Sequence, residues 1–103
     1  MIEKYDKLVR DKIPEIIRKK GRYPVIHTAT PSEYAFKLSK KLLEEVSEYL
    51  QSGKIEELAD VLEVINALCE VYGMTREQLE QIRRNKALER GKFLDKIILE
   101  RIE

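Results

Sequence analysis

The sequence predicts an all-α protein from three observations. Helix-start signals, Thr-Pro-Ser-Glu at 30–33 and Thr-Arg-Glu-Gln at 75–78, open two long segments. Apolar residues within the long segments recur every three or four positions, which is the helical period. The connections between the segments are short, as in antiparallel bundles. We therefore expect an antiparallel helical bundle in one domain spanning residues 1–103.

The N-terminal part is expected to hold one short helix and an extended connector. Asp11 is predicted to cap a helix over 12–20, and Pro14 would lie in its first turn, where a missing N–H does no harm. Residues 22–28 are too few for a helix and contain a proline. They are predicted to form an extended connector or an edge strand.

Three longer helices are expected after the connector. Thr30 is the predicted N-cap of the first, and Glu33 is expected to complete its capping box. Glycines after these segments are natural stops. The segment 93–102 is rich in apolar residues and fits either a final helix or a strand-like tail. The predicted ranges of the long helices are 31–51, 55–72 and 76–90.

The second long helix carries two neighbouring apolar stripes, so it is expected to be largely internal. The first stripe comprises Leu58, Leu62, Ile65 and Cys69. The second stripe comprises Val61, Val64 and Leu68. Because a small domain buries a modest fraction of its surface, added stability from oligomerisation is expected, and the second stripe is a candidate surface for it.

The composition and net charge limit which partners and locations are expected for the protein. The net charge is +1, which gives no bulk argument for a nucleic-acid polymer or an acidic membrane as partner. The single cysteine can form no disulfide within the chain and is expected to be a core residue. The apolar runs are short and interrupted by charge, so we expect neither a signal peptide nor a membrane span. We therefore expect a cytoplasmic protein.

Acidic residues stand on the inner faces of two neighbouring predicted helices. On a helix that advances about 100° per residue, Glu45 falls within about 20° of Leu38, on the apolar face. Glu48 lies three residues further, so its side chain neighbours that of Glu45. Glu57 and Asp60 repeat this spacing on the next helix, beside its second apolar stripe. If the two helices are antiparallel neighbours, these four carboxylates converge on one point.

Four carboxylates cannot share a sheltered site as free anions, because burial and mutual repulsion both disfavour the charged form. They either take up protons or bind a hard divalent cation, for which carboxylate oxygens are natural ligands. Facing acidic residues on bundle helices can build such a site. The alternative is a set of solvated, ion-paired carboxylates, common in a chain with 38% charged residues. That alternative is favoured for Glu44 and Glu56.

Two basic groups are candidates for phosphate binding, which a metal–carboxylate site acting on phosphates needs nearby. Arg10 and Lys12 stand near the N-terminus of the first predicted helix, where backbone N–H groups also favour anions. Lys86 and Arg90 lie four residues apart on one face of the last long helix. For any one of these cations, a solvated surface charge is the alternative. His27 is expected to be a surface or packing residue.

The acidic pattern, Glu-Glu-x-x-Glu at 44–48 and Glu-x-x-Asp at 57–60, resembles the signature of MazG-like, all-α nucleoside triphosphate pyrophosphohydrolases. That superfamily also holds phosphoribosyl-ATP pyrophosphohydrolase and the dimeric dUTPases. The segments 7–14 and 90–93 are similar to the ends of a small phosphoribosyl-ATP-pyrophosphohydrolase-like branch. The resemblance therefore spans nearly the whole chain.

The resemblance implies a helical bundle that forms a homodimer or a dimer of dimers, and hydrolysis that yields a nucleoside monophosphate and pyrophosphate. It implies phosphate contacts from Lys86 and Arg90. The hypothesis is a Mg²⁺-dependent hydrolase acting on phosphoric anhydrides, in which Glu44 or Glu45 deprotonates the attacking water. The alternatives are phosphoribosyl-ATP pyrophosphohydrolase of histidine biosynthesis, and a non-catalytic nucleotide-binding or self-assembling helical module. The implied ligands of Mg²⁺, with Mn²⁺ as a substitute, are Glu45, Glu48, Glu57 and Asp60.

Overall fold

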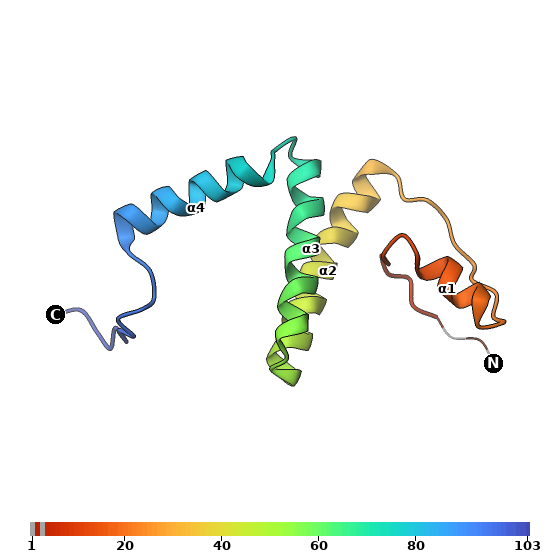
Figure 1. Cartoon of the computed structure of the whole chain (residues 1–103), viewed down its shortest axis with the longest axis horizontal. Helices are drawn as coiled ribbons and strands as arrows, with labels where there is room; N and C mark the ends of the chain where they lie inside the picture. Colours follow the sequence, from red (N-terminus) through yellow and green to blue (C-terminus); the bar gives the residue numbers. More distant parts are fainter. Residues whose placement is uncertain (1, 3) are drawn as a thin grey trace.

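The computed structural model describes residue 2 and residues 4–103, and this part of the chain is all-helical (Figure 1). No strand occurs among these residues, so the connector 22–28 does not form the edge strand that the sequence also allowed. The prediction of an all-α protein is confirmed. The helices, in chain order, are α1 (Ile13–Lys19), α2 (Pro31–Ser52), α3 (Ile55–Val71) and α4 (Arg76–Arg90).

The helix α1 begins without the cap that the sequence predicts. Its N-cap position is occupied by Lys12, and no side chain there accepts a hydrogen bond from the helix. The prediction of Asp11 as the cap is wrong because the chain enters α1 through a backbone turn. In that turn the Ile13 N–H donates to the Arg10 carbonyl at 3.1 Å, which satisfies one of the first free donors of the helix. Pro14 lies in the first turn, as expected.

The ends of α2 follow local sequence signals. The Thr30 hydroxyl accepts a hydrogen bond from the Glu33 N–H at 3.3 Å, so the predicted N-cap is confirmed. The capping box is only half formed, since the Glu33 carboxylate lies 3.0 Å from Nε2 of His27. At the other end Gly53 adopts a left-handed φ of +67°, which glycine tolerates best, and its N–H donates to the Tyr49 carbonyl.

The start of α4 is held by a complete capping box. The Thr75 hydroxyl accepts from the Gln78 N–H at 3.1 Å, and the Gln78 side-chain oxygen accepts from the Thr75 N–H at 2.8 Å. Both bonds satisfy backbone donors that would otherwise be free. The predicted start of this helix is therefore confirmed.

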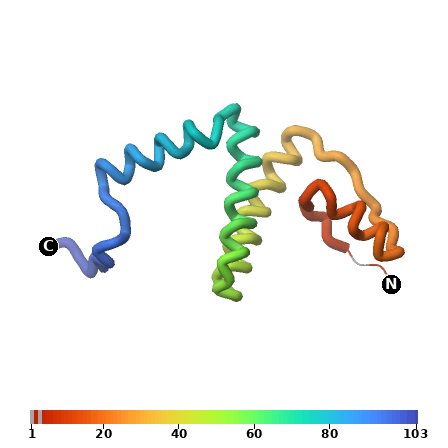
Figure 2. Tube along the Cα trace, in the orientation of Figure 1, coloured from red at the N-terminus to blue at the C-terminus, as the bar shows by residue number. Residues whose placement is uncertain are grey.

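The helices α2 and α3 form an antiparallel hairpin and are the only helices of the described chain that pack along their length (Figures 1 and 2). Leu38, Val64 and Cys69 are the buried apolar residues of this hairpin. The helix α4 meets α3 near the turn that joins them and then runs away from the hairpin. A single chain thus forms a hairpin with two projecting ends, and the expected bundle is not closed within it.

The apolar stripe predicted for self-association lies inside the hairpin instead. Val64 is buried, and Val61 and Leu68 are half-buried. Leu58 and Leu62, from the other stripe, keep 42% and 46% of their surface exposed. Cys69, also from that other stripe, is buried as well, so both stripes contribute to the interior of the hairpin. Helical periodicity finds two adjacent stripes without showing which positions face the neighbouring helix.

The chain is less compact than a typical domain with the same number of residues. Its radius of gyration is 18.1 Å, whereas a compact domain of this length has about 13 Å. The tail that follows α4, residues 92–103, forms neither helix nor strand, and its apolar side chains are all exposed. None of the helices in the described part of the chain is long and apolar enough to cross a membrane.

Candidate functional site

The acidic residues of α2 and α3 form two overlapping groups. In the first, Glu44, Glu45 and Glu48 each offer a carboxylate oxygen within 4.8 Å of the others. In the second, Glu45 of α2 meets Glu57 and Asp60 of α3 at the same spacing. Glu45 belongs to both groups, so it is the centre of the site. The structure thus brings together carboxylates of both helices, and Glu48 lies in the group formed by α2 alone.

Glu45 is the most sheltered charged residue of the described chain. It is 7% exposed, and its Oε2 is buried without any hydrogen-bond partner. Its Oε1 lies 3.4 Å from the ammonium of Lys41. Burial raises the pKa of Glu45 above its ordinary value, a hydrogen bond and charge repulsion from Glu48 raise it further, and Lys41 offsets part of the rise. A carboxylate in this position needs either a proton or a cation.

Glu44 has the opposite electrostatic environment. Burial acts to raise its pKa, but hydrogen bonds and charge from Lys7 and Lys41 outweigh it and hold the pKa of Glu44 below its ordinary value. Its Oε1 lies 3.0 Å from the Lys7 ammonium and 3.5 Å from that of Lys41. The hydrogen bond to Glu44 in turn raises the pKa of Lys7. Of the two bases that the sequence suggests, Glu45 has the higher proton affinity.

The N-terminal segment, residues 4–12, reaches across both helices of the hairpin. Arg10, expected to bind phosphate, donates a 2.7 Å hydrogen bond to the Asp60 carboxylate and lies 3.9 Å from that of Glu63. A guanidinium therefore occupies one side of the acidic group on α3. Asp60 and Glu57 are half-buried, so this pairing takes place at the rim of the site.

The donor set fits a hard divalent cation. Every donor atom is a carboxylate oxygen, which Mg²⁺ and Mn²⁺ prefer. The unpaired oxygen of Glu45 supplies the buried negative charge that such an ion would neutralise. The oxygens of Glu45, Glu57 and Asp60 lie within 4.8 Å of one another, so donors from both helices face one small volume.

The other predicted phosphate ligands lie elsewhere. Lys86 and Arg90 are exposed on α4, and the structure does not bring them to the acidic groups within one chain. Lys12 is exposed at the start of α1. His27 pairs with Glu33 outside the acidic groups, as expected for a surface histidine.

Lysines of α2 are the part of the site that sequence reasoning missed. The ammonium of Lys41 contacts both Glu44 and Glu45, and Lys37 binds the backbone of the N-terminal segment. Spacings of three and four residues between Lys41 and the two glutamates were a usable signal, since such pairs face each other on a helix.

Comparisons with known proteins assign no activity. No protein-family model matches the chain, and no solved structure matches it significantly. A protein of Mycolicibacterium smegmatis (strain ATCC 700084 / mc(2)155), described as uncharacterized, is 58% identical over 41 residues. That similarity covers 40% of this chain and 42% of the relative, so the chain spans less than half of the relative it matches. The function of the chain must therefore follow from its own residues.

Proposed function

We propose that the chain is a Mg²⁺-dependent nucleoside triphosphate pyrophosphohydrolase, which releases pyrophosphate and a nucleoside monophosphate. The observation that carries the proposal is the buried Glu45 carboxylate, whose unpaired oxygen lies where the acidic groups of α2 and α3 meet. The resemblance of these residues to the MazG-like signature supports the same reaction.

Each acidic residue has a proposed role. Bound Mg²⁺ would neutralise phosphate charge and lower the pKa of coordinated water. Glu45 would also accept the proton of the attacking water, because Glu44 is already paired with Lys7 and Lys41. Glu44 orients Lys7 and Lys41. The residues that would hold the ion are Glu45, Glu48, Glu57 and Asp60.

Arg10 has two alternating partners in this proposal. It pairs with Asp60 in the structure described above. When substrate is bound, its guanidinium exchanges the carboxylate for phosphate oxygens, which offer the same two-pronged acceptor geometry. Arg10 thereby balances the charge of the acidic group until the nucleotide arrives.

We also propose that the protein works as a homodimer or a dimer of dimers. The chain exposes 9684 Å², whereas a compact chain of this size exposes about 6,100 Å². The excess of roughly 3,600 Å² per chain is more than one partner contributes to an obligate homodimer interface, which buries about 2,000–5,000 Å² in total over both partners. The exposed apolar side chains of the hairpin and of the tail are the surfaces that a second copy would cover.

The test of the activity is release of pyrophosphate from a panel of nucleoside triphosphates that includes phosphoribosyl-ATP. We expect release with Mg²⁺ or Mn²⁺ and none with EDTA. Hydrolysis of phosphoribosyl-ATP alone would assign the histidine-pathway reaction. No release from any substrate, together with no binding of Mg²⁺, would leave a non-catalytic helical module as the function.

A further inference from the structure

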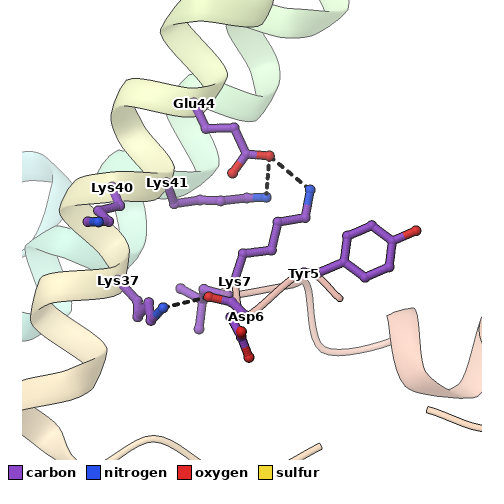
Figure 3. Close-up of a pocket in the computed structure, with 8 residues that line it drawn as sticks. Tyr5, Asp6, Lys7, Lys37, Lys40, Lys41 and Glu44 are labelled. Carbon is purple, nitrogen blue, oxygen red and sulfur yellow. Dashed lines mark hydrogen bonds and ion pairs between the residues drawn. The ribbon is translucent and has the colours of Figure 1, made fainter. Parts of the chain in front are cut away.

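A small cavity separates the N-terminal segment from the first half of α2 (Figure 3). Its volume is about 320 Å³, and it opens beside Glu44. Residues of two separate parts of the chain line it, so it exists only when the N-terminal segment is docked. The residues named in Figure 3 that line it are Tyr5, Asp6, Lys7, Lys37, Lys40, Lys41 and Glu44.

The cavity carries an excess of positive charge. Four lysines line it against two carboxylates, Asp6 and Glu44, which leaves a local charge of +2 at neutral pH. The whole chain has a net charge of only +1. The cavity therefore gathers positively charged side chains in a protein whose charges otherwise nearly cancel. Such a cavity favours the binding of an anion.

Three of the ammonium groups are held in place. Lys7 and Lys41 approach the same oxygen of Glu44 from two sides, and Lys37 donates to the backbone carbonyl of Asp6 (Figure 3). The fourth, Lys40, lies 4.9 Å from the centre of the Phe36 ring instead. The other three form a preorganised set of donors for a ligand with several acceptor oxygens.

The size of the cavity limits the ligand. Pockets that enclose a drug-sized molecule range from about 300 to 1,000 Å³, so 320 Å³ suits a pyrophosphate group better than a complete nucleotide. We propose that this cavity binds the pyrophosphate moiety of the substrate and of the released product, through Lys7, Lys37 and Lys41. This inference rests on the proposed function, because it places the leaving group of that reaction.

The cavity adjoins the acidic groups through one side chain. The Lys41 ammonium lies 3.5 Å from Glu44 and 3.4 Å from Glu45, so it borders both the cavity and the buried carboxylate. Phosphate oxygens entering the cavity would replace Glu44 as the partner of Lys7 and Lys41. The pyrophosphate is then held beside Lys41, which contacts Glu45, and Glu45 in turn meets the carboxylates of α3.

The experiment is calorimetric titration of the full chain with inorganic pyrophosphate, with and without Mg²⁺. The variant is Lys37→Gln, which removes a charge outside the acidic groups and keeps a polar side chain that is one atom shorter. Its matched control is Lys54→Gln, at the exposed N-cap of α3. We expect Lys37→Gln to weaken binding about tenfold, as for loss of one charge-assisted hydrogen bond, and Lys54→Gln to leave it unchanged.

The outcomes separate this inference from the proposed function. Saturable pyrophosphate binding that Lys37→Gln weakens supports the cavity, even if no nucleotide is hydrolysed. Nucleotide hydrolysis with pyrophosphate affinity unchanged in Lys37→Gln overturns the cavity and leaves the function standing. Weakening by Lys86→Gln but not by Lys37→Gln also overturns it, because the phosphate ligands would then lie on α4. Far-ultraviolet circular dichroism verifies that each variant keeps its helices.

Discussion

The α2–α3 hairpin and the C-terminal part, α4 with the tail, differ in which residues they shelter. The hairpin buries Leu38, Val64 and, among them, the carboxylate of Glu45. The tail exposes large apolar side chains such as Phe93, which is 96% exposed. One region hides a charge that would be more stable in water, and the other exposes apolar surface that would be more stable away from water.

Each anomaly points to a missing binding partner. A cation would stabilise the buried carboxylate, and a second copy of the chain would cover the apolar tail. In the proposed function the two regions are completed differently: a small ion would bind in the hairpin, and a second copy of the chain would cover the tail. Variants that act on one region and leave the other unchanged test this distinction.

The largest effect is expected for the hairpin. Glu45→Gln should lower pyrophosphate release at least a hundredfold, because it removes both a metal ligand and the proposed base. Glu48→Gln should also lower it. Steady-state kinetics with saturating Mg²⁺ measures both, and Glu56→Gln, on the exposed side of α3, is the matched control. Full activity in Glu48→Gln would count heavily against the mechanism.

The second effect concerns the tail. The double variant Ile97→Glu, Ile98→Glu places charge on two exposed apolar positions and should weaken self-association on the order of a hundredfold, since two buried apolar side chains are lost. Sedimentation equilibrium measures this change. Val25→Glu, in the exposed connector, is the control. A wild-type chain that remains monomeric at high concentration would contradict the proposed dimer.

The third effect concerns the N-terminal segment. Arg10→Gln should raise the affinity for Mn²⁺ about three- to tenfold, because the guanidinium that competes for Asp60 is removed. The cost in stability should be below about 1 kcal/mol, as both side chains are partly exposed. Manganese titration followed by electron paramagnetic resonance measures the affinity, with Lys12→Gln as control. A weaker affinity in Arg10→Gln would show that Arg10 supports the ion instead.

The smallest expected effect is on the stability of the metal-free protein, and it has opposite signs for Glu45 and Glu44. The folded-state pKa of Glu45 is raised, so the metal-free protein loses stability as pH rises through and above the ordinary glutamate range. Glu45→Gln removes this loss and should stabilise the metal-free protein at neutral pH by about 1 kcal/mol. Glu44 has a lowered pKa, so its contribution is present at neutral pH and lost on acidification. Glu44→Gln should therefore destabilise.

Urea unfolding of the two variants against wild type, at one fixed protomer concentration and several pH values, measures both signs. A Glu45→Gln variant that is less stable than wild type without metal would mean that its ion pair with Lys41 outweighs the cost of burial.

Local signals in the sequence predicted more of the fold than of the site. Thr30, Gly53 and the Thr75–Gln78 capping box act through bonds within a few residues, so their outcomes follow from the sequence alone. Which stripe of α3 faces α2 depends on the angle at which the two helices pack. Periodicity cannot supply that angle, so it offered Val61, Val64 and Leu68 as a candidate surface for self-association, whereas Val64 is buried within the hairpin.

The candidate site shows the same difference between features set by nearby residues and features set by distant ones. The inward position of Glu45 followed from its place on the helical wheel beside Leu38. The lysine cavity could not be predicted, because it forms between α2 and a segment some thirty residues earlier in the chain. The pairing of Arg10 with Asp60 spans fifty residues and is equally invisible to local patterns.

The most direct test is a calorimetric titration of the metal-free protein with Mn²⁺, repeated on Glu45→Gln and Glu56→Gln. The proposed function predicts saturable binding to the wild type and to Glu56→Gln, with loss of binding in Glu45→Gln. Absence of saturable binding to the wild type, or equal affinity in Glu45→Gln, would contradict the claim that the carboxylates of α2 and α3 hold a divalent ion.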